Sequence, residues 1–505
     1  MNKKNITTVK NSPVKDGICS LNGEEMYRIS NIDRLDPFLM SITSSEDHWM
    51  FVSSTGSLTA GRINEEGCLF PYETEDKLHR NHTHTGPVTV IRFLYPKGIT
   101  KIWRPFTNPF CNDLIHRHLY KNALGNHVVF EEINNELELI FRYSWRTSGP
   151  FGFVRTATIE NLGESPVNME ILDGLLNIMP SGLELNSQQS MSNLADAYKR
   201  SEFDTNTGLG IYSIEAVLMD QPDPSESLKA NVVWCNGLAN YTVDLHEKAV
   251  SRFITGKKPE YTHLLTGRRG AYLIHTGLML KPSSGENWDI IADVDQDQRD
   301  VVALQGLLQD RDNLCIQIND SIMQNRAELN SLIASADGLQ MTADQVGDYH
   351  HGANVLFNIM RGGVFRYNYS LEISDLCQFI NERNKYCFEN QKEILEKLPS
   401  DVNYIDLLRK ADQTSDPDFI RLCYEYVPIM FSRRHGDPSR PWNRFDIHIK
   451  RNDGSRLLNY QGNWRDIFQN WEALCFSYPE FIESIIAKFV NASTVDGFNP
   501  YRITR

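Results

Sequence analysis

The spacing of apolar residues changes once along this chain of 505 residues, and that change limits the fold more than any other sequence feature. From about Gly23 to about Ala303 the apolar residues recur at every second position, the period of a strand that buries one face. Turn residues recur regularly between these runs, and no amphipathic helix is expected among them. The pattern predicts a large antiparallel β-sandwich.

Two strand pairs are predicted from this alternation. In the first, His127–Ile133 pairs with Glu136–Trp145 across an Asn-Asn turn, and alternate residues from Leu137 to Trp145 point to one side. In the second, Phe151–Ile159 pairs with the strand that begins at Val167, across the turn NLGESP. A further strand is expected over Gly267–Leu280.

From about Val301 onward the apolar residues follow a spacing near 3.6, which predicts helices. One or two linker helices are expected over 301–336. Further helices are expected over His351–Met360, Ser374–Leu398, Tyr404–Ala411, Pro417–Ser432, Trp464–Phe476 and Phe481–Val490. We therefore predict a flexible N-terminus (1–22), a β-sandwich domain (23–303), a helical linker (304–345) and a helical domain (346–505).

Charge and composition exclude several classes of protein. A net charge of -14 and the lack of any basic block argue against a nucleic-acid partner. The sequence shows neither a signal peptide nor an apolar run long enough to span a membrane, so we expect a cytoplasmic protein without a membrane partner. Nine cysteines without a CxxC pair favour neither a disulfide framework nor a zinc site.

Two groups of histidines could share a metal, but both lack a supporting carboxylate placed by a helix. They are His79, His82 and His84 in a polar loop, and His116 and His118 on a predicted strand. We expect no metal site at either place.

The segment NYQGNWRDIFQNWEAL, residues 459–474, predicts a helix with two different faces. One side carries Trp464, Ile467, Phe468, Trp471, Leu474 and Cys475, and the other carries Arg465, Asp466, Gln469 and Asn470. The polar side contains no lysine and ends in planar groups that suit adjacent hydroxyls, as sugars present. The alternative is an ordinary amphipathic helix whose polar side pairs with neighbouring loops.

The segment SRRHGDPSRPWNRF, residues 432–445, concentrates positive charge in an acidic protein. Its cationic candidates for anion binding are Arg433, Arg434, His435 and Arg440, with Arg444 at the end. The alternative is structural: the arginines pair with Asp437, Asp446 and other carboxylates and fix a long connection.

These features together resemble the inverting glycoside phosphorylases of the cellobiose and chitobiose phosphorylase type. Gly462, Trp464, Arg465, Asp466 and Gln469 match the family's Arg-Asp-x-x-Gln turn, and residues 150–182 look like its sandwich hairpin. RHGDPSRPWN and NWRDIFQNWEAL are similar to segments of large cellobiose-phosphorylase-like proteins. The resemblance covers the chain from about Met40 onward.

The resemblance implies a sandwich that leads into the first part of an (α/α)6 toroid, over 346–505. It implies that Asp466 contacts sugar hydroxyls with support from Arg465, in a site with Gln461, Trp464 and Gln469. Asn470 stands where the family has Asp, and Gln461 where it has Arg, so sugar contacts differ. The family's general acid is expected beyond Arg505. The chain would then be the N-terminal part of a longer enzyme, inactive alone, with a C-terminal partner fragment or a homo-oligomer as the expected assembly.

The implied reaction needs no cofactor, because inorganic phosphate is the co-substrate. A carboxylic acid protonates the glycosidic oxygen of a β-linked gluco-oligosaccharide, and phosphate attacks the anomeric carbon from the opposite face. Two alternatives stay open: an inverting glycoside hydrolase on the same fold, and a noncatalytic carbohydrate-binding or assembly subunit.

Overall fold

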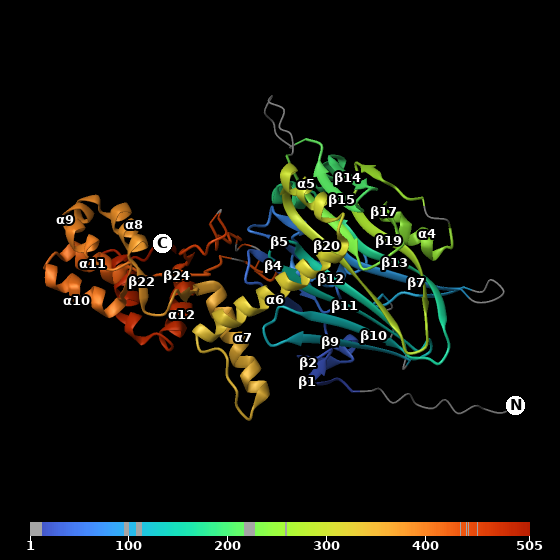
Figure 1. Ribbon diagram of the computed structural model, residues 1–505, viewed down its shortest axis with the longest axis horizontal. Helices are drawn as coiled ribbons and strands as arrows, with labels where there is room; N and C mark the ends of the chain where they lie inside the picture. Colours follow the sequence, from blue (N-terminus) through green and yellow to red (C-terminus); the bar gives the residue numbers. More distant parts are fainter. Residues whose placement is uncertain are drawn as a thin grey trace. The chain divides into compact units, whose positions relative to one another are not determined.

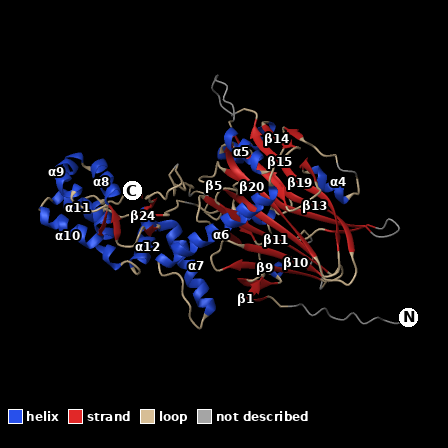
Figure 2. Ribbon diagram, in the orientation of Figure 1, coloured by secondary structure: helices blue, strands red, loops and turns tan. Residues whose placement is uncertain are grey.

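The computed structural model describes residues 13–94, 100–107, 114–216, 228–257, 260–434, 436–440, 442, 444–451 and 453–505. The chain divides into two compact units. The first contains residues 1–327 and 436–444, and the second contains residues 328–435 and 445–505. Strands dominate the first unit and helices the second (Figure 2).

The first unit is built on a large antiparallel sheet of eleven strands. In spatial order they are β1 (Lys15–Leu21), β2 (Glu24–Ser30), β9 (Ile115–Asn122), β10 (Val128–Asn134), β11 (Leu139–Ser148), β12 (Gly152–Asn161), β20 (Gly285–Asp297), β16 (Lys229–Asn236), β15 (Leu209–Ile214), β14 (Lys199–Asp204) and β18 (Leu264–Thr266).

Two smaller antiparallel sheets complete the strand layers. One has the order β17 (Thr242–His246), β19 (Gly270–Leu280), β13 (Val167–Ile178), β7 (Gly86–Leu94) and β8 (Thr100–Trp103). The other has the order β3 (Leu39–Ile42), β4 (His48–Ser53), β5 (Leu58–Arg62) and β6 (Cys68–Phe70). Side chains from all three sheets form one hydrophobic core. The predicted antiparallel β-sandwich followed by helices is therefore confirmed.

The turn NLGESP carries the chain from one sheet to another. The predicted pairing of Phe151–Ile159 with the strand after Val167 is wrong, because β12 pairs with β11 and β20 whereas β13 pairs with β7 and β19. Arg155 on β12 and Asp173 on β13 form a fully buried ion pair between the two sheets, with Nη1 2.7 Å from Oδ2. The two strands therefore face each other across the core.

Other strand predictions hold with shifted ends. The hairpin of β10 and β11 is confirmed, but Asn134 pairs with Leu139, so the turn occupies residues 135–138. The first strand, β1, lies inside the segment predicted to be a flexible N-terminus. The first unit also contains four short helices that period two did not predict: α1 (Glu75–Arg80), α2 (Leu185–Ser190), α3 (Ser192–Ala197) and α4 (Lys248–Ile254).

Two helices follow β20 and overlap residues 301–336, where one or two helices were expected. They are α5 (Gln298–Leu307) and α6 (Arg311–Ser335), and Asp297 caps α5 by accepting hydrogen bonds from the backbone of Arg299 and Asp300. Leu304, Leu314 and Ile318 pack on Trp234 and Ile291 of the large sheet, so these helices cover its outer face (Figure 1).

The second unit contains seven further α-helices among the described residues. They are α7 (Gln345–Gly362), α8 (Ile373–Arg383), α9 (Lys385–Glu396), α10 (Tyr404–Thr414), α11 (Pro417–Glu425), α12 (Trp464–Cys475) and α13 (Ile482–Asn491). Short strand pairs join them: β21 (Val364–Phe365) with β24 (Ile429–Met430), β22 (Ser370–Glu372) with β23 (Asp401–Asn403), and β25 (Gln461–Asn463) with β26 (Arg502–Thr504). A short 3-10 helix occupies Pro479–Phe481 in this unit, and another occupies Ile32–Arg34 in the first unit.

The helix predicted over Ser374–Leu398 is two helices. Asn384 has an extended backbone and its side chain accepts a hydrogen bond from the Cys387 backbone, so it ends α8 and caps α9. The helix predicted to reach Ser432 ends at Glu425. No helix of the described residues is long and apolar enough to cross a membrane.

Candidate functional site

Helix α12 begins where a short strand pair ends. Asn463 is the N-cap residue, and the Trp464 backbone N–H donates to the Tyr501 carbonyl at 3.0 Å. Asp466 therefore lies in the first turn, where the positive end of the helix dipole favours a carboxylate. Of the predicted sugar-binding residues, Gln461 lies on β25, and the N-terminal half of α12 carries Trp464, Arg465, Asp466 and Gln469.

The two faces of α12 differ from the prediction at two residues. Asn470, predicted on the polar side, is buried and donates to Asn358 Oδ1 of α7 at 2.9 Å. Phe468, predicted on the apolar side, is 41% exposed. The reason is the close approach of α7: a Cβ on Gly362 would lie 2.7 Å from the Asn470 Cβ. Trp471 is buried as predicted and donates to the Gly362 carbonyl at 2.7 Å.

Asp466 is available to a ligand. Its carboxylate accepts a hydrogen bond from Asn463 Nδ2 at 3.3 Å and lies 3.9 Å from Arg465 Nε. The Asp466 side chain is 44% exposed and that of Arg465 is 87% exposed. Gln469 is exposed on the next turn, whereas the half-buried Trp464 ring packs edge-on against Phe489, with ring centroids 4.6 Å apart.

A second carboxylate, Asp446, lies beside the same strand. Its Oδ2 accepts a hydrogen bond from Gln461 Nε2 at 2.5 Å, and its Oδ1 lies 2.7 Å from His448 Nε2. Arg502 of β26 donates to Gln461 and lies 3.8 Å from the same carboxylate. Sequence reasoning did not assign Asp446, His448 or Arg502 to the site, because 15 to 41 residues separate Gln461 from Asp446 and Arg502.

The two carboxylates are held from one side of β25. Gln461 contacts Asp446 and Asn463 contacts Asp466, and side chains two residues apart on a strand point to the same face. We name Asp446, Gln461, Asn463 and Asp466 the β25 polar cluster. It combines carboxylate acceptors with amides that both donate and accept, which is the chemistry that binds vicinal hydroxyls.

The predicted anion-binding arginines do not form one group within either unit. Arg433 is buried, its backbone N–H donates to the Met360 carbonyl at 2.8 Å, and its guanidinium lies 5.9 Å from the Phe431 ring centre. Arg434 forms a backbone bridge with Asp446 in the second unit, and Arg440 belongs to the first unit. His435 lies outside the described residues.

A buried ammonium lies behind the strand that leads to the cluster. Lys488 of α13 is 8% exposed, and its Nζ lies 5.3 Å from the ring centre of Tyr460 and 5.5 Å from that of Phe379. Burial, with a smaller contribution from Arg383, lowers the pKa of Lys488 to about 8.

The histidine groups have protein partners. His79 Nδ1 lies 2.8 Å from Ser53 Oγ, and His118 Nδ1 accepts a hydrogen bond from the Asn31 backbone at 3.2 Å. Burial lowers the pKa of His118 to about 4, so the imidazole is neutral at pH 7. Among the described residues, no three His, Cys, Asp or Glu side chains are placed to hold a metal ion.

Residues 365–428 match the family described as glycoside hydrolase family 149 insertion domain 1. This segment contains α8, α9, α10 and α11. Its ends meet in the β21–β24 pair, where Phe365 is opposite Ile429 and the Arg366 backbone donates to the Pro428 carbonyl at 3.0 Å. Adjacent ends are what an inserted domain requires. The match relates the chain to carbohydrate-active proteins, and the adjacent ends of the segment are compatible with a domain inserted between α7 and α12.

Two of the solved structures that match this chain are distant from it in sequence. A bacterial glucoamylase complexed with acarbose is 9% identical over 94% of this chain and 68% of its own, with a TM-score of 0.29. A protein from the human microbiome, provisionally assigned as a kojibiose phosphorylase, is 9% identical over 92% of this chain and 48% of its own, with a TM-score of 0.31. These scores carry no functional argument. None of the curated proteins compared with this chain matches it in sequence.

Proposed function

We propose that this chain is part of an inverting glycoside phosphorylase that acts on β-linked gluco-oligosaccharides with inorganic phosphate. The observation that carries the proposal is the β25 polar cluster, in which two partly exposed carboxylates are positioned by amide side chains of one strand. The glycoside hydrolase family match over 365–428 supports a carbohydrate ligand for the same unit.

In this proposal the cluster binds the sugar. Asp466 accepts hydrogen bonds from hydroxyls of the sugar on the nonreducing side of the scissile bond, and Arg465 and Gln469 reach the same ring from the exposed side of α12. Asp446 and Gln461 line the other side of the proposed sugar site. None of these residues is assigned as the general acid.

The proposed reaction inverts the configuration at the anomeric carbon. An acid protonates the glycosidic oxygen, the bond to the anomeric carbon breaks, and a phosphate oxygen attacks that carbon from the opposite face. Phosphate replaces the activated water of a hydrolase, so no carboxylate base is needed. Among the arginines near the cluster, Arg465 and Arg502 are exposed enough to receive a phosphate, whereas Arg433 is buried.

Binding of cello- and laminari-oligosaccharides by isothermal titration calorimetry tests the site. Losing a hydrogen bond to a charged group costs about 1.5–3 kcal/mol, so Asp466→Ala and Asp446→Ala should each weaken binding roughly ten- to hundredfold. Glu472→Ala, at an exposed carboxylate of the same helix, is the control and should leave affinity unchanged. Equal affinities for all four proteins would refute the assignment.

The reaction type needs a separate assay. When the protein is incubated with a β-linked gluco-oligosaccharide, sugar 1-phosphate should form only when inorganic phosphate is present. Release of free sugar at the same rate without phosphate would establish the hydrolase alternative instead.

A further inference from the structure

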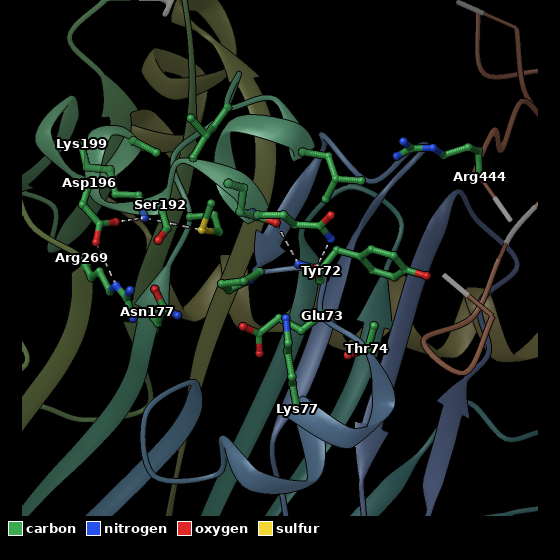
Figure 3. Close-up of a pocket in the computed structure, with 17 residues that line it drawn as sticks. Tyr72, Glu73, Thr74, Lys77, Asn177, Ser192, Asp196, Lys199, Arg269 and Arg444 are labelled. Atoms are coloured by element: carbon green, nitrogen blue, oxygen red, sulfur yellow. Dashed lines mark hydrogen bonds and ion pairs between the residues drawn. The ribbon is translucent and has the colours of Figure 1, made fainter. Parts of the chain in front are cut away.

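A pocket of about 470 Å³ lies in the first unit and is lined by no residue of the β25 polar cluster (Figure 3). Residues 71–77, which lead into α1, form one wall, and residues 183–199 around α2 and α3 form another. The end of β13 closes it with Asn177 and Met179. This volume fits a small molecule of one or two sugar rings.

The pocket is cationic in an acidic protein. Its lining includes Lys77, Lys199, Arg269 and Arg444 but only two carboxylates, those of Glu73 and Asp196. Asp196 is shared: its Oδ1 lies 2.7 Å from Lys199 Nζ and its Oδ2 lies 3.1 Å from Arg269 Nε (Figure 3).

Two of these cations can contact an anion. The Arg269 side chain is 46% exposed, and one carboxylate serves both it and Lys199. Lys77 is exposed and makes no ion pair within the part of the chain that the structure describes. An excess of positive charge in a concave site attracts anions.

Asn177 adds a hydrogen-bonding group in the wall. It lies at the register shift between β13 and β19, with a left-handed backbone (φ 56°), a region that asparagine enters more readily than most residues. Its Nδ2 donates to Thr85 Oγ1 at 3.0 Å, while its buried Oδ1 accepts no hydrogen bond from the described residues. A buried acceptor of this kind calls for a donor such as a ligand hydroxyl or a bound water.

We infer that this pocket binds a small phosphorylated sugar. The phosphate contacts Lys77 and Arg269 at the exposed side, and sugar hydroxyls contact Glu73 and, directly or through a bound water, Asn177. The site goes beyond the proposed function, because it lies in the other unit and uses no residue of α12.

Calorimetric titration with glucose 6-phosphate tests the inference, with glucose and inorganic phosphate as matched probes. This ester is not a product of attack at an anomeric carbon, so its binding does not depend on the proposed reaction. We expect it to bind at least about tenfold more tightly than either probe, since each lacks one half of the contacts. No binding at millimolar concentration, or equal binding of inorganic phosphate or of glucose, would overturn the inference.

Variants locate the site. Lys77→Gln and Arg269→Gln should each weaken glucose 6-phosphate binding about tenfold, whereas Lys410→Gln, at an exposed lysine of the second unit, should not. Asn177→Gly removes the carboxamide at a backbone conformation that glycine adopts freely, so it should weaken binding without unfolding the chain, which circular dichroism checks. Binding that survives both Lys77→Gln and Arg269→Gln would place the ligand elsewhere.

The two proposals can be refuted independently of each other. Asp466→Ala should leave glucose 6-phosphate affinity unchanged, and Lys77→Gln should leave oligosaccharide affinity unchanged. If Asp466→Ala abolished glucose 6-phosphate binding, the ester would be bound at the β25 polar cluster and the pocket would lose its assignment.

Discussion

Asp173→Ala should destabilise the first unit by about 3–5 kcal/mol, because it leaves the Arg155 guanidinium buried without its counter-ion. The carboxylate accepts two hydrogen bonds from Arg155, at 2.7 and 2.9 Å, and one each from Thr89 Oγ1 at 2.6 Å and Trp288 Nε1 at 2.7 Å. Each donor left without a partner adds roughly 1–3 kcal/mol, so the loss should fall at or above the upper end of that range.

A matched pair of variants separates charge from packing. Asp173→Asn keeps the shape and an acceptor oxygen but removes the charge, and it should lose about 3 kcal/mol or more. The double variant Arg155→Met with Asp173→Leu removes both charges and should be clearly more stable than Asp173→Ala. Urea denaturation, followed by hydrogen exchange of peptides from β12 and β13, measures the free energy of unfolding in this unit. A loss below about 1 kcal/mol for Asp173→Ala would refute the buried inter-sheet pair.

Three further predictions concern local features. Gly363→Ala should lower the free energy of unfolding, measured by urea denaturation, by at least about 2 kcal/mol more than Gly454→Ala. Both glycines have φ +82°, but of the two only Gly363 has another atom where a Cβ would lie, 2.3 Å from Ile429 Cγ2. Equal losses of stability in the two variants would contradict this prediction. Lys488→Met should raise the free energy of unfolding at pH 7 by up to about 3 kcal/mol. Because the pKa of Lys488 is about 8 in the folded chain and 10.5 in the unfolded chain, the stability of the wild type rises from pH 8 to 10.5, and the advantage of the variant should shrink over that range. An advantage that stays constant with pH would contradict this prediction. His118 has a pKa of about 4 in the folded chain and 6.5 in the unfolded chain, so it contributes stability above pH 6.5 that is lost as the pH falls towards 4. The His118→Gln variant should therefore lose less stability than the wild type between pH 6.5 and 4.5. Parallel curves of stability against pH for the two proteins would exclude this role.

The sequence predicted the fold class because period two and period 3.6 are local properties. Leu139, Phe141, Tyr143 and Trp145 alternate into the core of the sandwich as predicted. An apolar period of two does not indicate which sheet a strand joins. The pattern therefore could not predict that the chain crosses from one sheet to another at the point where a hairpin was predicted. Arg155 and Asp173, which pair between the two sheets, are eighteen positions apart, so no local pattern in the sequence indicates that they meet.

The candidate site was predicted in part for a similar reason. The helical pattern identified α12 and its first-turn carboxylate, Asp466, but not the neighbour against which the helix packs. Gly362 allows α7 to approach, and that contact buries Asn470 and leaves Phe468 at the edge. The contacts of Asp446 are also nonlocal: Gln461 lies 15 residues further along the chain, and Arg502 of β26 lies 41 residues beyond Gln461.

Hydrogen-exchange mass spectrometry of the chain with and without a β-linked gluco-oligosaccharide tests the proposed sugar site most directly. The account predicts slower exchange in peptides covering 459–470 and around Asp446 when the sugar is present, and no such change in the Asp466→Ala variant. Exchange that is unchanged in these peptides while another region is protected would contradict a sugar-binding role for the β25 polar cluster.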